Sequence, residues 1–450
     1  MRGIAALPNA GPEREYGMGE DPILIIGAGI AGLSAAEELS RAGKRVSLME
    51  ARDRPGGRIY TLRCGRDNLP VELGAEFIHG KKNETWNFIR KARLKTKEVP
   101  DRHWQPKNGS LKENARFWDE LDSVFGKLDP NEGEESFLSF LKRHKRLKPS
   151  AREQAIEYVE GFHAAPVSKV GICALAKANA AAEEAEGTRT FRIEGGYGLL
   201  VEWLVKRLAR RRVQIHYHST AKVIRWTRGR VEVEAWRDGR RKIFNANQVL
   251  LTVPIGVLKS RRSESVLRFN PRLRQKERAI QGLEMGHIMR VTLQFRSRFW
   301  PVKNFGFVHS TDPWWPTWWT QPKGNFLTGW AGASRVNRME KASHEKLISE
   351  AVRALAAVFN VRKEKVRALL AASYMHDWTN DPFAFGAYSY TPVGMVDMPK
   401  LLATPIEQTL FFAGEATDSD GDQGTVSGAL ASGRRAAKEM LAESDGLRLF

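Results

Sequence analysis

The stretch that decides the fold is residues 23–32, which read ILIIGAGIAG. Its first four residues form a short apolar run, a pattern that predicts a buried strand of a parallel sheet. The glycines that follow have the spacing GxGxxG, and the alanine-rich segment 33–42 predicts a helix that ends at Gly43. The sequence therefore predicts a strand, a tight turn and a helix in direct succession.

A second strand pattern, residues 44–49, follows the predicted helix, and Glu50 stands at its end. Gly27 permits the tight turn, Gly29 lets backbone N–H groups approach a diphosphate, and Gly32 lets the helix pack closely on the strand. Glu50 can accept hydrogen bonds from a ribose diol. A lone GxGxxG often only turns the chain, but with flanking strands and a terminal acid in this order it predicts a dinucleotide-binding site.

Length and composition limit the class of protein. The chain has 450 residues, of which 42% are hydrophobic, enough for one large domain or a few ordinary ones. Two cysteines, Cys64 and Cys173, exclude a disulfide-stapled scaffold and a four-thiolate zinc site. No apolar run reaches the length of about 18 residues that a membrane-spanning helix needs, and residues 1–19 lack the apolar core of a secretory signal. We expect a soluble, cytoplasmic protein.

The chain is strongly basic, with 72 lysines and arginines against 52 acids and a net charge of +20. Such a charge fits an acidic partner, nucleic acid or membrane, or surface charge without a function of its own. The basic runs are dispersed and lack the interleaved aromatic residues of a single-strand binding groove. They are 142–148, 206–212, 237–242 and 259–262. We favour surface charge and expect no specific nucleic-acid partner.

The segment after the ribose-binding acid distinguishes the candidate cofactors. Residues 50–58 read EARDRPGGR, and the guanidinium groups of Arg52 and Arg58 beside Gly57 suit a second anionic surface close to the backbone. A bare nicotinamide site does not need them. The motif resembles the flavin-containing amine oxidase family, which includes monoamine, polyamine and L-amino acid oxidases and the flavin histone demethylases. The resemblance implies FAD as the cofactor.

The resemblance continues along nearly the whole chain, with the family's motifs in the family's order. Chance does not explain the agreement of so many motifs in the same order. The segment 71–80 resembles the polyamine oxidase and bacterial amine oxidase version of the family's motif. They are 71–80 (VELGAEFIHG), 249–259 (VLLTVPIGVLK), 282–286 (GLEMG), 378–390 (WTNDPFAFGAYSY), 412–417 (FAGEAT) and 424–429 (GTVSGA).

The resemblance implies a mixed α/β fold, in which a Rossmann-type FAD-binding domain is assembled from separated segments and a substrate-binding domain with a sheet and helices is inserted between them. The residue patterns support part of this, since they predict helices within 115–190, strands within 213–250 and a helix over 426–443. Because the chain ends soon after that helix, we expect no tail anchor. The expected divisions are an extension in 1–21, the FAD-binding domain in 22–82, 190–262 and 396–450, and the substrate-binding domain in 83–189 and 263–395.

The family's cofactor-binding positions carry over to this chain. Backbone N–H groups of Thr425 and Val426, at the start of the last helix, match those that stabilise negative charge on the reduced flavin, and Thr425 can at the same time be an ordinary N-cap. Glu415 matches the acid that bonds the ribityl or diphosphate region. Ala387 replaces the flavin-linked cysteine of monoamine oxidases, so we expect non-covalent FAD. The full set is Gly27, Gly29, Ala31, Gly32, Glu50, Arg52, Gly57, Arg58, Glu76, Phe77, Ala221, Glu415, Thr425 and Val426.

The family holds its amine in a slot with aromatic walls over the flavin. Tyr388 matches one wall and Trp378 a tryptophan near the ring, while Thr425 stands where monoamine oxidases have the second aromatic wall. His79 matches a histidine near the substrate in polyamine oxidases, with a purely structural role as an equal alternative. Five further tryptophans either line an apolar substrate channel or form a core cluster. They are Trp314, Trp315, Trp318, Trp319 and Trp330.

One departure from the family concerns the reaction with oxygen. The family usually has a lysine in the strand after the MG dipeptide, bonded through a water to flavin N5, and this sequence has Arg290 there. A guanidinium can hold the water as a donor, but it does not lose a proton. O2 is the acceptor that the resemblance implies, and a dehydrogenase with another electron acceptor stays open.

Amine oxidation needs the neutral amine, and with a pKa of about 10.4 roughly one alkylamine in a few thousand is neutral at pH 7. The site must shift this equilibrium by desolvation. Asp418, Asp420 and Asp422 could attract an amine or form a solvated loop. Their DxDxD spacing lacks the glycine and glutamate of a calcium loop, so we expect no metal.

These features predict an FAD-dependent amine oxidoreductase that converts a C–N bond of a primary or secondary amine into an imine by hydride transfer to flavin N5, with O2 reduced to hydrogen peroxide. An L-amino acid oxidase, or another FAD-dependent dehydrogenase or desaturase of the superfamily, is the alternative. A basic flavoprotein that mainly binds nucleic acid or a membrane surface is a more distant one.

Overall fold

The computed structural model describes residues 13–14, 23–65, 67–81, 83–129, 133–301 and 305–446 of the chain. Most of the expected extension 1–21 lies outside these residues. Its described part is strand β1 (Glu13–Arg14), which pairs in parallel with β14 (Arg240–Ala246). Helices and strands from distant parts of the sequence share the same layers, and the expected mixed α/β class is confirmed.

The strand that opens the glycine motif, β2 (Ile23–Ile26), lies in the middle of a five-stranded parallel sheet. Its side chains alternate between two parts of the core: Ile25 packs with helices, and Leu24 packs with a second, mixed sheet on the other face. Because both faces are covered, the strand is apolar throughout. In spatial order the strands are β11 (Gln214–His216), β3 (Val46–Met49), β2, β15 (Val249–Leu251) and β24 (Leu410–Phe412).

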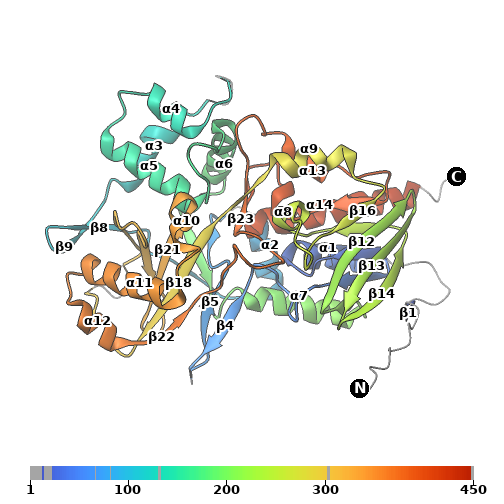
Figure 1. Cartoon of the computed structure of the whole chain (residues 1–450), viewed down its shortest axis with the longest axis horizontal. Helices are drawn as coiled ribbons and strands as arrows, with labels where there is room; N and C mark the ends of the chain where they lie inside the picture. Colours follow the sequence, from blue (N-terminus) through green and yellow to red (C-terminus); the bar gives the residue numbers. More distant parts are fainter. Residues whose placement is uncertain are drawn as a thin grey trace, which may run out of the picture.

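Helices cover one face of the parallel sheet, and two of them, α1 and α14, lie side by side (Figure 1). A Cβ on Gly433 of α14 would lie 2.3 Å from the Ala31 carbonyl oxygen, so glycine is needed for this close approach. The predicted last helix is confirmed and extends a few residues further than expected. The helices of this layer are α1 (Ile30–Arg41), α2 (Glu84–Ala92), α7 (Gly198–Arg210) and α14 (Val426–Gly446).

A mixed five-stranded sheet covers the other face of the parallel sheet. Its three central strands pair antiparallel, and each edge strand pairs in parallel with its neighbour. Its register shifts after Ala221, where β12 carries a bulge. The alternating pattern that predicted strands within 213–250 is confirmed. The strands of this sheet, beside β1 and β14, are β13 (Arg230–Arg237), β12 (Ser219–Thr227) and β16 (Arg268–Asn270).

A seven-stranded sheet organises the other half of the molecule. One of its faces packs through Val291, Val308 and Trp318 against α11 (His344–Val358). Three short elements flank α11 in the sequence: the turn η1 (Ala333–Arg335), helix α10 (Val336–Met339) and helix α12 (Lys363–Leu369). In spatial order the strands are β22 (Leu370–Tyr374), β18 (Ile288–Phe295), β21 (Phe326–Gly332), β20 (Thr317–Thr320), β19 (Phe307–His309), β8 (His103–Lys107) and β9 (Ser110–Glu113).

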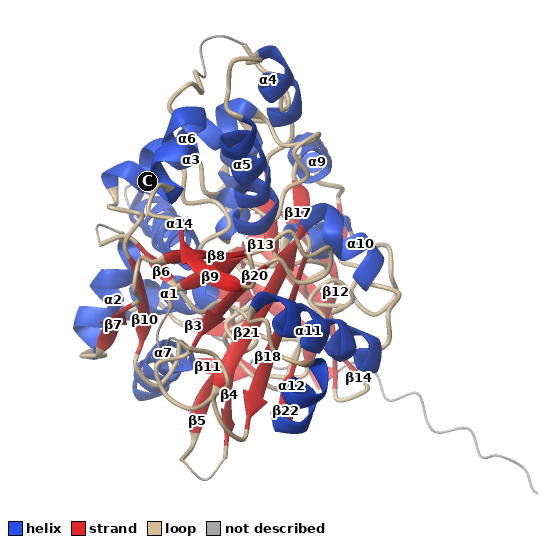
Figure 2. Ribbon diagram, turned by 90° about the vertical axis from the view of Figure 1, so that its left-hand side faces the viewer, coloured by secondary structure: helices blue, strands red, loops and turns tan. Residues whose placement is uncertain are grey.

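Four helices are grouped beyond the sheets (Figure 2), which confirms the helices predicted within 115–190. They are α3 (Phe117–Phe125), α4 (Phe137–Arg143), α5 (Pro149–Phe162) and α6 (Ile172–Glu184). Among the described helices, none is both long and apolar enough to cross a bilayer.

Short elements connect the larger layers. Strands β6 and β10 pair beside the cavity described below, and β17 pairs with β23. The bounds are β4 (Thr61–Cys64), β5 (Leu69–Glu72), β6 (Ile78–His79), β7 (Thr96–Glu98), β10 (Thr190–Ile193), β17 (Glu284–Gly286), β23 (Tyr388–Tyr390), α8 (Ile255–Lys259), α9 (Arg274–Gly282), α13 (Met398–Ala403) and η2 (Glu415–Thr417).

Candidate functional site

A cavity of about 1630 Å³ is lined by residues of the parallel sheet, the seven-stranded sheet and helices α3, α5 and α6. It reaches the carboxyl ends of β2, β3 and β15, where Gly27, Glu50 and Thr252 follow the last strand residues. Open α/β sheets bind ligands at this edge. Ordinary ligand pockets measure about 300–1,000 Å³, so this cavity has room for a large cofactor together with a substrate.

The cavity brings together almost all of the predicted site residues. Gly32 is the exception, because it faces the backbone of Gly27. The roles of the others stay predictions, but their common location is a finding. The predicted residues in the wall are Gly27, Gly29, Ala31, Glu50, Arg52, Gly57, Arg58, Glu76, Phe77, His79, Ala221, Arg290, Trp378, Tyr388, Glu415, Thr425 and Val426.

The loop after β2 keeps a space free of side chains. A Cβ on Gly29 would have no described atom within 4 Å, and no described side chain caps the start of α1. Gly27 has a φ of +109°, and a Cβ on Gly32 would lie 2.0 Å from the Gly27 carbonyl oxygen. The backbone therefore requires Gly27 and Gly32, whereas Gly29 leaves open the space before the helix. This arrangement fits a diphosphate at the N-terminus of α1.

Glu50 is held at the end of β3 by two backbone donors. Ala28 N donates to Oε2 and Arg52 N donates to Oε1, each at 2.9 Å. Burial raises the pKa of the carboxyl group, and these hydrogen bonds oppose the rise. Each carboxylate oxygen has further acceptor capacity. The two hydrogen bonds therefore fix the orientation of the Glu50 carboxylate, and its expected bond to a ribose stays a prediction.

The two arginines of the 50–58 motif bind carboxylates of the chain itself. Arg52 forms a two-pronged ion pair with Asp381 at 2.8 and 2.7 Å. Arg58 Nη1 lies 2.8 Å from Glu415 Oε1. The anionic surface that the sequence suggested for these guanidinium groups is thus supplied by side chains from distant motifs, and the pairs fix the motifs against one another.

Glu415 connects three segments of the wall. Ser389 Oγ donates to Oε2 at 2.6 Å, and Gly424 N donates to the same oxygen at 3.1 Å. With Arg58 on Oε1, these contacts position β23 and the turn before α14. A direct bond from Glu415 to the cofactor stays a prediction, since the contacts described here are all with the protein.

Helix α14 begins at the cavity with a capped end. Thr425 Oγ1 accepts from Gly428 N at 2.9 Å, so Thr425 is the N-cap of the helix. Its hydroxyl donates to the Asp422 carbonyl oxygen at 2.7 Å, and its backbone N–H donates to the same oxygen at 3.2 Å. The Thr425 N–H is therefore engaged within the turn, and its expected role toward the reduced flavin stays a prediction. Val426 lines the cavity as the first residue of the helix.

Glu76, in the cavity wall, joins Arg290 of the wall to Arg192 behind it. Its Oε1 lies 2.6 Å from Arg192 Nε, and its Oε2 lies 2.5 Å from Arg290 Nη2. Trp319 Nε1 also donates to the carboxylate, at 3.1 Å from Oε2. Burial alone would raise the pKa of Glu76, but Arg192 and Arg290 together hold it below its usual value. The Glu76 carboxylate therefore keeps its negative charge inside the protein.

The cluster of Arg192, Glu76 and Arg290 carries one net positive charge. Arg290 Nη1 donates to the Gly74 carbonyl oxygen at 2.9 Å. Arg290 Nε is buried and has no hydrogen-bond partner among the described residues. A buried donor without a partner beside an excess positive charge suits a ligand with negative charge or a lone pair.

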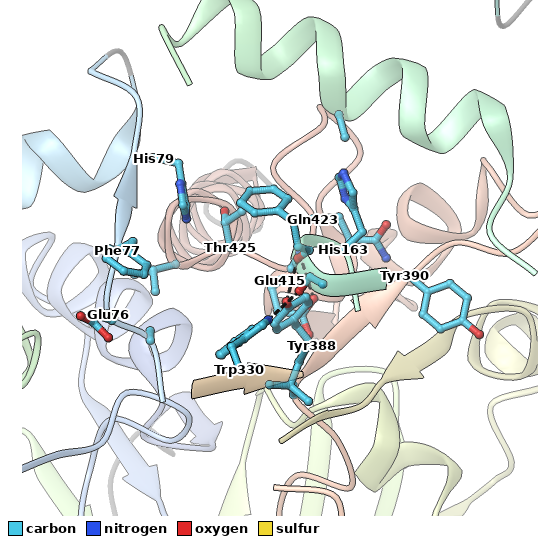
Figure 3. A pocket seen from close by; sticks show the side chains of 18 of the residues that line it. Glu76, Phe77, His79, His163, Trp330, Tyr388, Tyr390, Glu415, Gln423 and Thr425 are labelled. Atoms are coloured by element: carbon cyan, nitrogen blue, oxygen red, sulfur yellow. Dashed lines mark hydrogen bonds between the residues drawn. The ribbon is translucent and has the colours of Figure 1, made fainter. Parts of the chain in front are cut away.

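Aromatic side chains enclose another part of the cavity, around Tyr388, Thr425, His79 and Trp330 (Figure 3). Tyr388 Oη donates to the Phe162 carbonyl oxygen at 2.7 Å, and the Phe162 ring lies 5.0 Å from the His79 ring, edge to face. Burial lowers the pKa of His79 to about 4, so this histidine is neutral at pH 7.

Trp378 closes the wall near the 50–58 motif. Its Nε1 donates to the Leu73 carbonyl oxygen at 2.7 Å, and a Cβ on Gly74 would lie 3.3 Å from its ring. The Arg52 guanidinium lies 5.8 Å from the centre of the Trp378 ring. Packing and a hydrogen bond therefore hold Trp378 in one orientation.

The sequence left open whether the other tryptophans line a substrate channel or form a core cluster, and the structure shows both locations. Trp315 and Trp318 are fully buried in the core beside α11. Trp319, the next residue along β20, lines the cavity together with Trp330. Alternation along the strand explains the split. Trp314 packs at the edge of the core.

The acidic loop after η2 is organised by Asp418. Its Oδ1 accepts from Asp420 N at 3.1 Å and from Asp422 N at 2.8 Å. Burial and the neighbouring Asp422 raise the pKa of Asp418 to about 6. Within the described part of the chain, no group of three or more histidines, cysteines or acids is arranged to hold a metal ion.

The sequence interpretation missed Arg192, Phe162 and Asp381. Arg192 stands in the otherwise apolar strand TFRI, and a lone cation in such a strand signals a buried partner. Asp381 lies inside the 378–390 motif, where a carboxylate for a fixed guanidinium could have been sought. Phe162, at the end of α5, carries no signal that distinguishes it from a core residue.

Comparisons with known proteins give one consistent result. Residues 30–441 match the family model described as flavin containing amine oxidoreductase. Polyamine oxidase 3 of Oryza sativa subsp. japonica is 30% identical, over 92% of this chain and 88% of that protein. Lysine-specific histone demethylase 1 homolog 2 of Arabidopsis thaliana is 28% identical over 95% of this chain, which spans only 59% of that relative's length.

Among solved structures, wild-type putrescine oxidase bound to putrescine is similar, with a TM-score of 0.77 at 21% identity. The similarity covers 94% of this chain and 99% of that one and shows a shared fold. The resemblance that the motifs carried is confirmed.

Proposed function

Because the chain belongs to the flavin-containing amine oxidoreductase family, in which FAD is the expected flavin, we propose that it oxidises an amine with FAD. The C–N bond of a primary or secondary amine becomes an imine, which water hydrolyses to a carbonyl compound. One observation carries the proposal: the glycine loop after β2 and the aromatic group around Tyr388 share a single cavity.

The cavity wall provides what such a cofactor requires. Bound FAD supplies the acceptor for the hydride that leaves the carbon next to the amine. The loop at Gly27 and Gly29 would hold the diphosphate, and Glu50 would accept hydrogen bonds from the ribose. Arg290, held by Glu76, keeps a net positive charge in the wall, which stabilises negative charge in the cavity.

The aromatic part of the cavity favours the neutral form of the amine. Phe162, Tyr388 and Trp330 present apolar surface, which disfavours an ammonium relative to an amine. His79 is neutral because burial lowers its pKa to about 4, so it adds no positive charge and can accept a hydrogen bond. Thr425 stands where monoamine oxidases have the second aromatic wall, and in this cavity Phe162 supplies an aromatic wall instead.

The arginines of the wall argue against a substrate carboxylate. Among the described residues, those that line the cavity are Arg52, Arg58 and Arg290. Each is already paired with a carboxylate of the chain. A two-pronged bond to the carboxylate of an amino acid substrate needs two adjacent N–H donors of one guanidinium group, whereas Arg290 Nε is a single buried donor without a partner among the described residues. We therefore favour an amine without a carboxylate over the L-amino acid alternative.

Non-covalent attachment of FAD is also part of the proposal. Ala387 in the wall offers no nucleophile, and neither Cys64 nor Cys173 lines the cavity. Acid precipitation should therefore leave the flavin in the supernatant, whereas flavin in the pellet would contradict the proposal. Neither Cys64 nor Cys173 forms a disulfide bond, which supports the reducing cytoplasm as the compartment.

The division into a cofactor domain and a substrate domain belongs to the same proposal. The parallel sheet draws its strands from 22–82, 190–262 and 396–450, the three segments assigned to FAD. The seven-stranded sheet draws its strands from 83–189 and 263–395, the segments assigned to the substrate.

Anaerobic titration of the purified yellow protein with a panel of amines and amino acids tests the function. A substrate amine bleaches the flavin spectrum, and admission of air restores it with release of hydrogen peroxide. Restoration by a quinone but not by air would show another electron acceptor. Bleaching by amino acids alone, or by no amine at all, would overturn the proposal.

A further inference from the structure

Three hydrogen-bonded side chains end in the cavity wall, away from the groups assigned to the reaction. Asp101 Oδ1 lies 3.0 Å from His103 Nε2, and His103 Nδ1 lies 2.9 Å from His309 Nε2. All three residues line the cavity. The proposed oxidation uses none of them.

Neighbouring aromatic groups hold this relay of Asp101, His103 and His309 in place. The Phe117 ring stacks on His103 at a centroid distance of 3.6 Å and on His309 at 4.9 Å. Trp118 Nε1 donates to both oxygens of Asp101 at 3.0 Å. His103 is buried, whereas Asp101 reaches solvent. The rings therefore cannot exchange partners without disturbing the packing.

Asp101 determines which nitrogen of each imidazole carries the hydrogen. A carboxylate only accepts, so His103 has its hydrogen on Nε2 and its lone pair on Nδ1. His309 Nε2 must then donate to that lone pair, which leaves the lone pair of His309 on Nδ1. No partner of His309 Nδ1 is found among the described residues. Burial, with His103 beside it, lowers the pKa of His309 to about 3, so the ring is neutral at pH 7.

The sheet register places His309 relative to the reacting end of the cavity. His309 pairs with Thr317, Thr317 with Trp330, and Trp330 with Arg290. These four residues therefore form one row on the cavity face of the seven-stranded sheet, and all of them line the cavity. Three strand spacings of about 4.8 Å separate the two ends of the row by about 14 Å.

We propose that His309, oriented through His103 by Asp101, is a binding site for a second N–H or ammonium group at the end of the substrate remote from the oxidised carbon. The inference rests on the proposed amine oxidation and extends it to selectivity. The site accepts hydrogen bonds and does not donate them, so it favours a distal nitrogen over a carbonyl or carboxylate. The charge of Asp101 at the far end of the relay adds attraction for a cation.

Calorimetric titration of the dithionite-reduced holoprotein tests the site, because the reduced protein binds amines without oxidising them. The probes are α,ω-diaminoalkanes of increasing length and the matching 1-aminoalkanes. We expect the dissociation constants of the two series to separate by about tenfold or more once the chain reaches His309, as for one hydrogen bond to a charged group. No separation at any length would overturn the proposal.

Variants locate the effect. His309→Phe keeps a ring in the stack and should reduce the separation to less than about twofold, since the acceptor of the distal nitrogen is lost. His103→Phe also keeps a ring and should weaken the separation, since nothing then fixes the tautomer of His309. Asp101→Leu, at the solvent-exposed end, disturbs packing least and should weaken the separation by freeing the tautomers of both rings. His344→Gln is the control, since His344 is exposed on α11 outside the cavity wall and should leave the separation unchanged. A separation that persists in folded, flavin-loaded His309→Phe would overturn the proposal.

Failure of this inference and failure of the proposed function have different signatures. If amines bleach the oxidised protein but the reduced protein does not distinguish the two series, the His309 site is wrong and the oxidation stands. If the reduced protein distinguishes them but amines leave the oxidised spectrum unchanged, the binding site stands and the oxidation is wrong.

Discussion

Arg290 and Glu76 form an ion pair that is almost withdrawn from solvent. Nη2 lies 2.5 Å from Oε2, and the two side chains are 5% and 3% exposed. Arg192 binds the other carboxylate oxygen at 2.6 Å. Among the described residues, neither guanidinium group pairs with a second carboxylate that could replace Glu76. The Glu76 carboxylate therefore affects both the charge of the cavity wall and the stability of the fold.

Replacement of Glu76 by Gln leaves both buried arginines without a counter-charge. We expect Glu76→Gln to lower the free energy of unfolding by about 3–5 kcal/mol, the usual effect of removing one member of a buried pair. Urea denaturation followed by circular dichroism measures the change. Glu98→Gln is the matched control, since Glu98 pairs with Arg189 at 2.7 Å with side chains 45% and 38% exposed, and no resolvable change is expected there. Equal losses in the two variants would contradict this account.

Two glycines of the loop after β2 should respond differently to alanine. A Cβ on Gly32 would clash with the Gly27 carbonyl oxygen at 2.0 Å, so Gly32→Ala is expected to disrupt the strand–helix unit and to yield little folded protein. A Cβ on Gly29 meets no described atom within 4 Å, so Gly29→Ala should fold but retain less flavin. The measurements are the melting temperature and the ratio of flavin to protein absorbance. A Gly29→Ala variant with full flavin content would argue against a diphosphate at this loop.

Phe162 and Trp236 are the large hydrophobic side chains most exposed in the described structure, at 39% and 47%. Phe162 lines the cavity and Trp236 does not. Phe162→Ala should raise KM for an amine substrate by about tenfold to a hundredfold, because the apolar contact of one aromatic side chain is worth about 1.5–3 kcal/mol. Steady-state kinetics with Trp236→Ala as the control decide the matter, and a similar KM change in both variants would speak against Phe162 as a substrate wall.

The buried neutral state of His79 predicts a pH dependence of stability. Burial lowers its pKa from 6.5 to about 4 in the folded protein. Between these values the unfolded chain binds a proton that the folded chain does not, so the free energy of unfolding falls as pH decreases through this window and is fully retained above it. Denaturant titrations across the window should show a shallower decline in His79→Asn than in the wild type. Parallel curves would contradict the assignment.

The sequence predicted the parts of the site whose physics is local. Gly27 and Gly32 meet within one turn, so their spacing alone implies the clash that excludes a side chain. The helix cap at Thr425 is equally local, since the N–H that its hydroxyl accepts belongs to Gly428, three residues later. Such features can be read from neighbouring residues because the chain itself brings them together.

Pairings across the fold could not be predicted in the same way. Arg52 and Asp381 are 329 residues apart, and neither motif contains a signal that identifies the partner of its charged residue. Trp318 and Trp319 differ only in the face of β20 on which they lie, so their division between core and cavity requires the strand register. The direction of the hydrogen bonds in the relay of Asp101, His103 and His309 depends likewise on two strands and a loop that meet only in the folded protein.

The ion pairs that join Arg52 to Asp381 and Arg58 to Glu415 also order the assembly of the molecule in time. Half of each pair is synthesised within the first 58 residues, and the other half emerges from the ribosome more than 300 residues later. The part of the cavity wall that these pairs join is therefore incomplete in a nascent chain until residue 415 has been synthesised, and we expect capture of the proposed cofactor to follow that point.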